Sequence, residues 1–404
     1  MSEIRVTNVI GENGSSPVNF TQGINMSGIV TATSFVPTVG QLSHRNVIIN
    51  GDAKISQRAT SQGSITSGGY YAVDRWYVTM DTAGTWTMYQ DSDVPSGYGF
   101  SKSVSLDVNT ANTSLSAGSR AMLSYRLEGQ DVQRFCKGTA NAKKYALSFW
   151  VKCGKTGTYV LELFDHDNSR HICKTYTISS ANTWEQKKLI FDNETSNPFG
   201  NDNGKSLELQ FYLAAGSNFT SGTLATSWAS NTNANRAVGQ VNVADSTSNK
   251  YFLTGVQLEV GPVTTPFEHR SFGDELARCQ RYFYRHGDLN STRNYALMGN
   301  GMIGHNGSTD TGKIEVVAPV RMRQQPTVSV IGTDSFIIHT GGGETGTSDA
   351  IGTLGSGGLW TAASSDINFW IDFGRTSGGS PNRGVACIVY ANNNGANLGF
   401  SAEL

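Results

Sequence analysis

Short apolar runs, separated by clusters of Gly, Asn, Ser and Asp, follow one another through most of this 404-residue chain. Between residues 45 and 262 the runs number about ten, and no helical hydrophobic period extends across them. Short runs with polar turns between them are typical of a β-sandwich or jelly roll. We therefore predict an all-β fold with strands at 47–49, 70–80, 85–89, 102–108, 121–127, 145–152, 159–164, 187–191, 207–213 and 251–260.

Several of these runs alternate between apolar and polar side chains, which places every second residue on the same face of a sheet. Leu147, Phe149 and Val151 share one face of their run, and the odd positions of 207–213 share another. These apolar faces are predicted to form the core. The opposite faces carry Ser148, Trp150, Lys152, Glu162, Glu208, Gln210 and Tyr212.

Residues 1–44 differ from the rest of the chain because they are poor in aromatic residues and have only short apolar stretches. So little apolar surface does not offset the entropy that a monomer loses when it becomes ordered. Ile24, Met26 and Phe35 are nevertheless more apolar than a linker requires. We expect an extended segment that becomes ordered by winding around copies of itself or by docking on another protein.

One later segment breaks the β pattern. Leu276, Cys279 and Phe283 recur three and four residues apart and form one apolar stripe of a helix. Acidic residues near its start and arginines near its end suit the helix dipole. We predict a helical hinge at 272–286 that joins a middle domain at 45–271 to a glycine-rich C-terminal β head at 287–404.

The charged residues exclude several classes of partner. The 31 Lys and Arg and 32 Asp and Glu give a net charge of −1, so no long-range field attracts nucleic acid. No apolar run approaches the roughly 18 residues that span a bilayer, and the first residues lack the pattern of a secretory signal. Five cysteines without close pairing predict free thiols. We expect neither a metal nor a cofactor, since no motif for either is present.

Three stretches of the chain together resemble a known family. They are NVIINGDAKISQR at 46–58 with YAVDRW at 71–76, LSFWVK at 147–152, and LTGVQLEVGPVTTPFEHRS at 253–271 with ELARCQRYF at 275–283. Over residues 45–285 the chain is similar to the carbohydrate-binding-module-like β-sandwich in tail fibres of marine and cyanobacterial bacteriophages. The opening 44 residues resemble the virion-attachment ends of such fibres, and 319–404 resemble their C-terminal heads.

The resemblance implies a homotrimeric fibre that is a structural part of the virion. Residues 1–44 would attach it to the phage tail or baseplate, and its outer β domains would recognise a host cell-surface glycan, such as lipopolysaccharide or capsule. The protein would be made in the host cytoplasm and released by lysis within assembled particles, which explains why no secretory signal is needed. We expect no enzymatic activity.

A sugar-binding surface needs aromatic planes that stack on a sugar ring, flanked by polar groups that bind its hydroxyls. The polar faces of the predicted strands offer this composition, and they would form one patch if the strands are neighbours. The candidate residues are Trp150, Lys152, Glu162, Glu208, Gln210, Tyr212 and, in a glycine-rich loop of the head, Trp360. The alternative is that these aromatic residues are buried under a loop or a trimer neighbour.

Other interpretations stay open. Glu162 and Glu208 would be the carboxylate pair of a glycoside hydrolase if they lie about 5–5.5 Å or about 6.5–9.5 Å apart, which would make the protein a polysaccharide depolymerase. A non-adhesive structural collar or spacer also fits the pattern. The acidic turns at 165–168 and 201–204 would hold calcium only if about six to eight oxygens converge there, and ordinary turn chemistry also explains them.

Two smaller motifs have structural interpretations. Asp74, Arg75 and Trp76 are predicted to form a packing unit, with Arg75 paired to a carboxylate and Trp76 in the core. His166 and His171 straddle a turn and are predicted to lie at the surface.

Overall fold

The computed structural model describes residues 43–287, 297–306, 309–331, 335–340, 349–352, 364–374, 386–391 and 397–404. The predicted attachment segment at 1–44 lies outside the described residues except for Ser43 and His44. Among the residues described, no helix is both long enough and apolar enough to cross a membrane.

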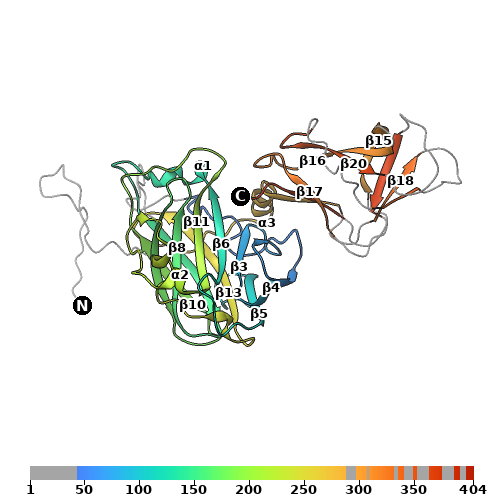
Figure 1. The fold of residues 1–404 in the computed structure, drawn as a ribbon. Helices are drawn as coiled ribbons and strands as arrows, with labels where there is room; N and C mark the ends of the chain where they lie inside the picture. Colours follow the sequence, from blue (N-terminus) through green and yellow to red (C-terminus); the bar gives the residue numbers. More distant parts are fainter. Residues whose placement is uncertain are drawn as a thin grey trace, which may run out of the picture. The chain divides into compact units, whose positions relative to one another are not determined.

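Two antiparallel sheets pack face to face in the first part of the described chain (Figure 1). Sheet A has six strands in the order β1 (Ser61–Ile65), β4 (Thr85–Asp91), β5 (Ser103–Thr110), β13 (Lys250–Val260), β7 (Tyr145–Cys153) and β10 (Glu185–Phe191). Sheet B has seven strands in the order β12 (Ala229–Ser230), β9 (Arg170–Ile178), β8 (Gly157–Asp165), β11 (Lys205–Ala215), β6 (Arg120–Glu128), β3 (Trp76–Asp81) and β2 (Gly69–Tyr70). The predicted β-sandwich is confirmed.

The core lies between the two sheets. Trp76 of β3 packs edge-to-face on Tyr125 of β6, with ring centroids 5.3 Å apart. Phe149 of β7 contacts Phe211 of β11 across the sandwich at a centroid distance of 5.2 Å. All four side chains are fully buried. The apolar faces predicted for 145–152 and 207–213 are therefore confirmed as core faces.

Three strands of the sandwich are absent from the predicted set: the short strands β1 and β12, and the nine-residue strand β9 of sheet B. In β9, the side chains of Ile172, Lys174, Tyr176 and Ile178 share the inward phase, and the half-buried Lys174 interrupts the apolar series. The aliphatic part of a lysine can pack against apolar neighbours while its ammonium reaches solvent. A pattern based on residue polarity alone therefore misses this strand.

The strand predicted at 47–49 is wrong. Val47 and Ile48 are buried in the core, but their segment does not join a sheet ladder. Side chains bind its backbone instead: the N–H of Ile48 donates to Asn46 Oδ1 at 2.9 Å, and the N–H of Ile49 donates to the Tyr125 hydroxyl at 2.8 Å. An irregular segment can therefore be buried here without orphaned backbone groups.

The predicted helical hinge at 272–286 is helical only in its first part. Helix α3 covers Phe272–Gln280, and the hydroxyl of Ser271 caps it by accepting from the N–H of Asp274 at 3.2 Å. The chain then enters strand β14 (Phe283–His286). Phe283 is buried there, and the guanidinium of Arg58 lies 3.7 Å from the centroid of its ring. Pairing of β14 with a later strand thus overrides the helical pattern.

The later part of the chain is also β. One sheet has three strands in the order β14, β22 (Asn397–Ser401) and β17 (Thr327–Ile331). The other has six strands in the order β19 (Asp349–Gly352), β18 (Ser335–Thr340), β21 (Ala386–Ala391), β15 (Leu297–Asn306), β16 (Thr309–Val317) and β20 (Asn368–Gly374). A separate small core includes Ile314, Phe369 and Phe400.

The Asp74–Arg75–Trp76 unit is confirmed as a packing unit. Trp76 is fully buried, and Arg75, itself 1% exposed, pairs with the carboxylate of Glu403. The Arg75 guanidinium also lies 3.4 Å from the ring centroid of Tyr282. Both partners come from far along the chain, so the sequence gives no sign of which carboxylate balances this arginine.

Candidate functional site

The structure divides the predicted site residues between the two outer faces of the sandwich. Trp150 and Lys152 lie on β7 of sheet A, whereas Glu162, Glu208, Gln210 and Tyr212 lie on β8 and β11 of sheet B. The expectation of one continuous patch is therefore wrong, because the strands that carry it belong to different sheets. Trp360 lies outside the described residues, and Trp370 is half-buried on β20.

The outer face of sheet B is covered by the segment 216–241, which contains helix α2 (Ser217–Thr220), a 3₁₀ turn (Asn233–Asn235) and β12. Phe219, Ala225 and Ala237 of this segment pack with Val160 and Tyr212 of the sheet in a second apolar cluster. The Tyr212 hydroxyl is buried there and donates to Glu162 Oε2 at 3.1 Å. For Tyr212, burial under a loop is thus the interpretation that holds.

Glu162 is fully buried under this cover and its charge is balanced there. Arg236 Nη2 contacts Glu162 Oε2 at 2.9 Å, and His171 Nδ1 lies 2.6 Å from Glu162 Oε1. Burial alone raises the pKa of Glu162, but the hydrogen bond from His171 and the charge of Arg236 outweigh it and leave the pKa below its usual value. His171 is fully buried, so its predicted surface position is wrong.

Glu162, His171 and Cys173 lie close enough together to suggest a metal site. Arg236 already hydrogen-bonds both carboxylate oxygens of Glu162, and burial raises the pKa of the Cys173 thiol. A metal-binding thiol has to ionise, and a guanidinium beside the ligands would repel the cation. The group is therefore a structural ion-pair cluster and does not fit a metal.

Glu208 lies at the border of the covered face and is 3% exposed. Its carboxylate contacts Arg126 Nε at 3.2 Å and His166 Nε2 at 2.7 Å. Burial raises the pKa of Glu208, yet these two partners together with Lys205 lower it to about 2. A glycoside hydrolase requires one carboxylic acid whose pKa is raised so that it can protonate the leaving group. Neither Glu162 nor Glu208 has that property.

The acidic turn at 165–168 forms an ion pair with a lysine from another part of the chain. Lys137 Nζ lies 2.7 Å from Asp165 Oδ2 and 2.8 Å from Glu194 Oε2, and all three side chains are buried. The other oxygen of Asp165 accepts the N–H groups of Asp167 and Asn168 at 2.9 and 3.1 Å. Turn hydrogen bonds and an ammonium group therefore account for this carboxylate, as predicted for ordinary turn chemistry.

The outer face of sheet A, by contrast, carries an open groove of about 400 Å³. It runs beside β7 and β10 and is bounded by the segment 92–101 and by the loop that follows β13. The residues that line it are Tyr98, Phe100, Trp150, Gln186, Lys188, Thr264, Thr265, Pro266, Phe267 and His269. Of the predicted site residues that the structure describes, only Trp150 lines this groove.

The groove has two groups of aromatic rings. Tyr98, which is 55% exposed, lies over Trp150 with ring centroids 4.3 Å apart. Phe100, Phe267 and His269 form the second group, with centroid distances between 4.9 and 5.3 Å. Half-exposed rings of this kind offer flat apolar surfaces to a ligand.

The backbone of sheet A makes room for these rings. Gly255 of β13 has φ +61° at a shift in the register between β13 and β7, which marks a bulge. A Cβ at this position would come within 2.5 Å of the Phe100 ring. Only glycine combines this left-handed conformation with so close an approach. The glycine of the Leu253–Val260 motif is therefore needed to seat Phe100.

Lys152 lies next to the groove but does not line it. Its ammonium pairs with Asp93 and lies 4.2 Å from the ring centroid of Phe252. The indole N–H of Trp184 donates to the other oxygen of Asp93 at 2.9 Å. Partial burial raises the pKa of Asp93, but the hydrogen bonds from Lys152 and Trp184 lower it below its usual value. Lys152 thus positions the segment that carries Tyr98.

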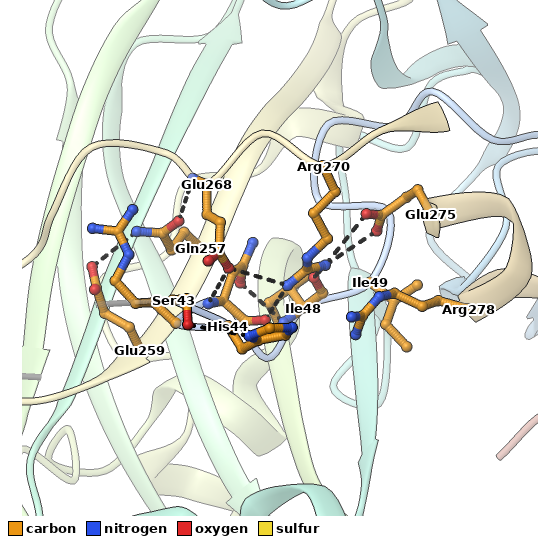
Figure 2. Close-up of polar contacts among 12 residues, drawn as sticks. Ser43, His44, Ile48, Ile49, Gln257, Glu259, Glu268, Arg270, Glu275 and Arg278 are labelled. Atoms are coloured by element: carbon orange, nitrogen blue, oxygen red, sulfur yellow. Dashed lines mark hydrogen bonds and ion pairs between the residues drawn. The ribbon is translucent and has the colours of Figure 1, made fainter. Parts of the chain in front are cut away.

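Two stretches of the family resemblance, at 46–58 and 253–271, contact each other through a polar network that we call the clasp. It comprises residues 43–49, 256–259, 268–270 and Glu275 (Figure 2). Asn46 donates from its side chain to the carbonyl of Val256 at 3.0 Å, and its backbone N–H donates to Glu268 at 3.0 Å. Arg270 donates to the carbonyl of Ile48 at 3.0 Å and pairs with Glu275 at 3.3 Å.

The clasp fixes one wall of the groove. Glu268 and Arg270 bind segment 43–49, whereas the alternate residues Phe267 and His269 line the groove. Alternate residues of the PFEHR stretch at 266–270 thus have different roles: two of them hold the segment 43–49, and the others line the groove. Sequence reasoning singled out this stretch for its resemblance but missed that its alternate positions face outward, as it also missed Tyr98, Gln186 and Lys188. The available signals were the polar phase of 185–191 and the two aromatic residues Tyr98 and Phe100, which lie two positions apart in the sequence.

The sequence matches no protein-family model and no curated protein. Among solved structures, the chain is similar to the enzymatically active domain of tailspike protein 4 from bacteriophage CBA120, with 15% identity and a TM-score of 0.29 over 53% of this chain. The match spans only 21% of that tailspike chain.

Carbohydrate-binding modules are also among the similar structures. A CBM4 module has 8% identity and a TM-score of 0.28 over 52% of this chain and 97% of its own. The module TmCBM61, solved in complex with β-1,4-galactotriose, has 10% identity and a TM-score of 0.28 over 54% of this chain and 99% of its own. With TM-scores below 0.5, these likenesses carry no functional conclusion.

Proposed function

We propose that this protein binds a glycan through the groove on the outer face of sheet A. The observation that carries the proposal is the contact of the exposed Tyr98 with the half-buried Trp150, beside the exposed side chains of Gln186 and Lys188. The rings offer a plane on which a sugar can stack, and the amide and ammonium groups can bind its hydroxyls. On the outer face of sheet B, by contrast, the candidate residues Glu162, Gln210 and Tyr212 are buried and hydrogen-bonded to Arg236 or to one another.

We infer further that the protein is a bacteriophage tail fibre, located in the tail of the virion. The sequence resemblance over residues 45–285 supports this role, together with the attachment role that it implies for residues 1–44 on the tail or baseplate. In a homotrimer, three identical grooves on one fibre would engage a host cell-surface glycan such as lipopolysaccharide or capsule. Weak binding at each groove would then add up to a high avidity, because later contacts become effectively intramolecular.

We propose binding without catalysis. The carboxylate pair considered for a depolymerase, Glu162 and Glu208, is buried and ion-paired, which argues against that pair as an acid and a base. A non-adhesive collar or spacer is the other candidate, and the exposed Tyr98 beside Trp150 favours an adhesin over it. Trp360 stays a prediction as an additional contact in the C-terminal head.

A glycan array probed with the full chain tests this proposal. We expect binding to a subset of bacterial surface glycans, and a loss of at least about tenfold in affinity in Trp150→Ala, because the stacking plane is removed. The matched control is Trp370→Ala, which removes a half-buried tryptophan from β20. A parallel reducing-end assay on the bound polysaccharides tests for depolymerase activity.

Three outcomes contradict parts of the proposal. If Trp150→Ala binds glycan as wild type does and Trp370→Ala loses binding, the binding site lies in the C-terminal sheets. Release of reducing ends would favour the depolymerase. Binding to no glycan by a correctly folded chain would favour the spacer.

A further inference from the structure

The described residues that line the groove include basic side chains but no acidic one. Lys188 and His269 line it, and no aspartate or glutamate is among the lining residues that the structure describes. The acidic residues beside the groove already have partners. Asp93 binds Lys152 and Trp184. Glu259, which is buried, accepts from the N–H and the hydroxyl of the lining residue Thr265, and Glu268 accepts from the N–H of Asn46. An anionic ligand would therefore meet no repelling carboxylate in the groove itself.

Lys188 differs from its neighbours in having no ion-pair partner among the described residues. On the same strand, Lys187 contacts Glu185 at 2.6 Å, and near the end of the strand Lys144 contacts Asp192 at 2.9 Å. Lys188 is exposed, and its side chain stands on the groove side of β10 with that of Gln186. Its ammonium is therefore free to bind a ligand at no cost in broken contacts.

The register of β10 and β7 sets the position of this charge relative to the aromatic plane. Gln186 lies directly opposite Trp150, and Lys188 lies opposite Ser148, two residues further along both strands. Two residues of a strand span about 6.6 Å, which is close to the width of one sugar ring. A ring stacked on Trp150 would thus hydrogen-bond Gln186 and extend an edge substituent toward Lys188.

We propose that the groove selects glycans that carry a carboxylate, such as uronic acid residues, and that Lys188 is the residue that recognises this group. The inference rests on the proposed function and adds the substrate class to it. A lysine ammonium binds a carboxylate as a point charge with three donors and accepts several orientations of the ligand. Trp150 supplies the stacking surface, and Lys188 discriminates an acidic sugar from its neutral counterpart.

Affinity electrophoresis of the full chain tests the inference. The gels contain polygalacturonate, alginate or hyaluronan, each compared with its carboxyl-reduced form, in which the uronic acid becomes a neutral sugar. We expect at least one acidic polysaccharide to bind about fivefold more tightly than its reduced form. Lys188→Gln should abolish this difference, whereas Lys143→Gln, which removes an exposed lysine outside the groove, should preserve it. Trp150→Ala should weaken binding to both forms.

The outcomes separate this inference from the proposed function. Equal binding of the acidic and reduced forms, or an unchanged preference in Lys188→Gln, would overturn the inference and leave glycan binding intact. Binding to neutral glycans on the array but to none of these acidic polysaccharides would do the same. Binding to no glycan in either assay would overturn both. Dextran sulfate is the control for general attraction to polyanions. If it retains the protein as strongly as the carboxylated polymers do, and Trp150→Ala does not reduce this retention, the inference is overturned.

Discussion

The two outer faces of the sandwich have similar residue patterns in the sequence, but the side chains on one face are open to solvent and those on the other are covered. Both faces alternate aromatic, charged and amide side chains with the apolar side chains of the core. On sheet A the pattern stays open and forms a groove around Trp150, whereas on sheet B the segment 216–241 covers Glu162, Gln210 and Tyr212. Alternation along a strand therefore identifies an outer face but does not show whether that face is free.

The cover changes the electrostatic requirements of the residues beneath it. A buried carboxylate is unstable without a partner, and Glu162 has Arg236 and His171. An exposed ammonium needs no partner because water solvates it, and Lys188 has none among the described residues. The same residue types thus serve as a structural network on one face and as a binding surface on the other.

The largest effect is expected on the covered face. Arg236→Met leaves the carboxylate of Glu162 buried without its arginine, which should lower the free energy of unfolding by about 3–5 kcal/mol. Urea unfolding followed by circular dichroism measures the change. Arg278→Met is the matched control, because its ion pair with Asp274 is exposed and should contribute only about 0.3–0.5 kcal/mol. Equal losses in the two variants would show that the cover does not seal this face.

A second effect concerns acid stability at the border of the covered face. The pKa of Glu208 is about 2 in the folded protein, below its usual value of 4.5. Its carboxylate therefore stabilises the fold above pH 4.5, and this contribution of about 3 kcal/mol is lost as the pH falls toward 2.

Glu208→Gln should remove this part of the pH dependence. We expect the difference in free energy of unfolding between wild type and variant to be largest at pH 6 and to shrink steadily below pH 4.5. Urea titrations at several pH values measure it. Glu315→Gln, which changes an exposed residue of β16, is the control. A difference that stays constant with pH would contradict the role assigned to the Glu208 ion pairs.

The smallest effect is expected from the open face. Trp150→Ala should lower the free energy of unfolding by about 1 kcal/mol, since the ring loses mainly its contact with Tyr98. Tyr212→Ala on the covered face should cost about 3–5 kcal/mol, because it leaves a cavity in the second apolar cluster. Thermal unfolding of both variants checks the contrast. Similar costs would mean that Trp150 contributes to packing more than to a binding surface.

Much of the fold was accessible from the pattern of residues. The alternation at 145–152 and 207–213 predicted β7 and β11 and assigned their core faces correctly. It failed at β9, where Lys174 lies on the inward phase, and at 47–49, where side chains bind the backbone in place of a strand. The two failures have different causes. In β9 the aliphatic part of a lysine takes an inward position, and at 47–49 the side chains of Asn46 and Tyr125 satisfy the backbone in place of a neighbouring strand.

The candidate site was less accessible. The sequence pointed to Trp150, but it also grouped this residue with Glu162 and Tyr212, which lie on the other sheet. The groove is built from three separate stretches around Tyr98, Trp150 and Phe267, together with Gln186 and Lys188 of β10. No spacing rule links stretches so far apart in the chain, so their meeting could not be predicted.

By itself, the sequence determined the class of fold, because alternating apolar residues can be buried only by strands that pack in two layers. It also determined which side chains point away from the core, because that property has a period of two residues. Only the tertiary structure decided which outer face stays open. That choice depends on where the segment 216–241 lies and on how the clasp holds the wall of the groove, and both depend on contacts between residues distant in sequence.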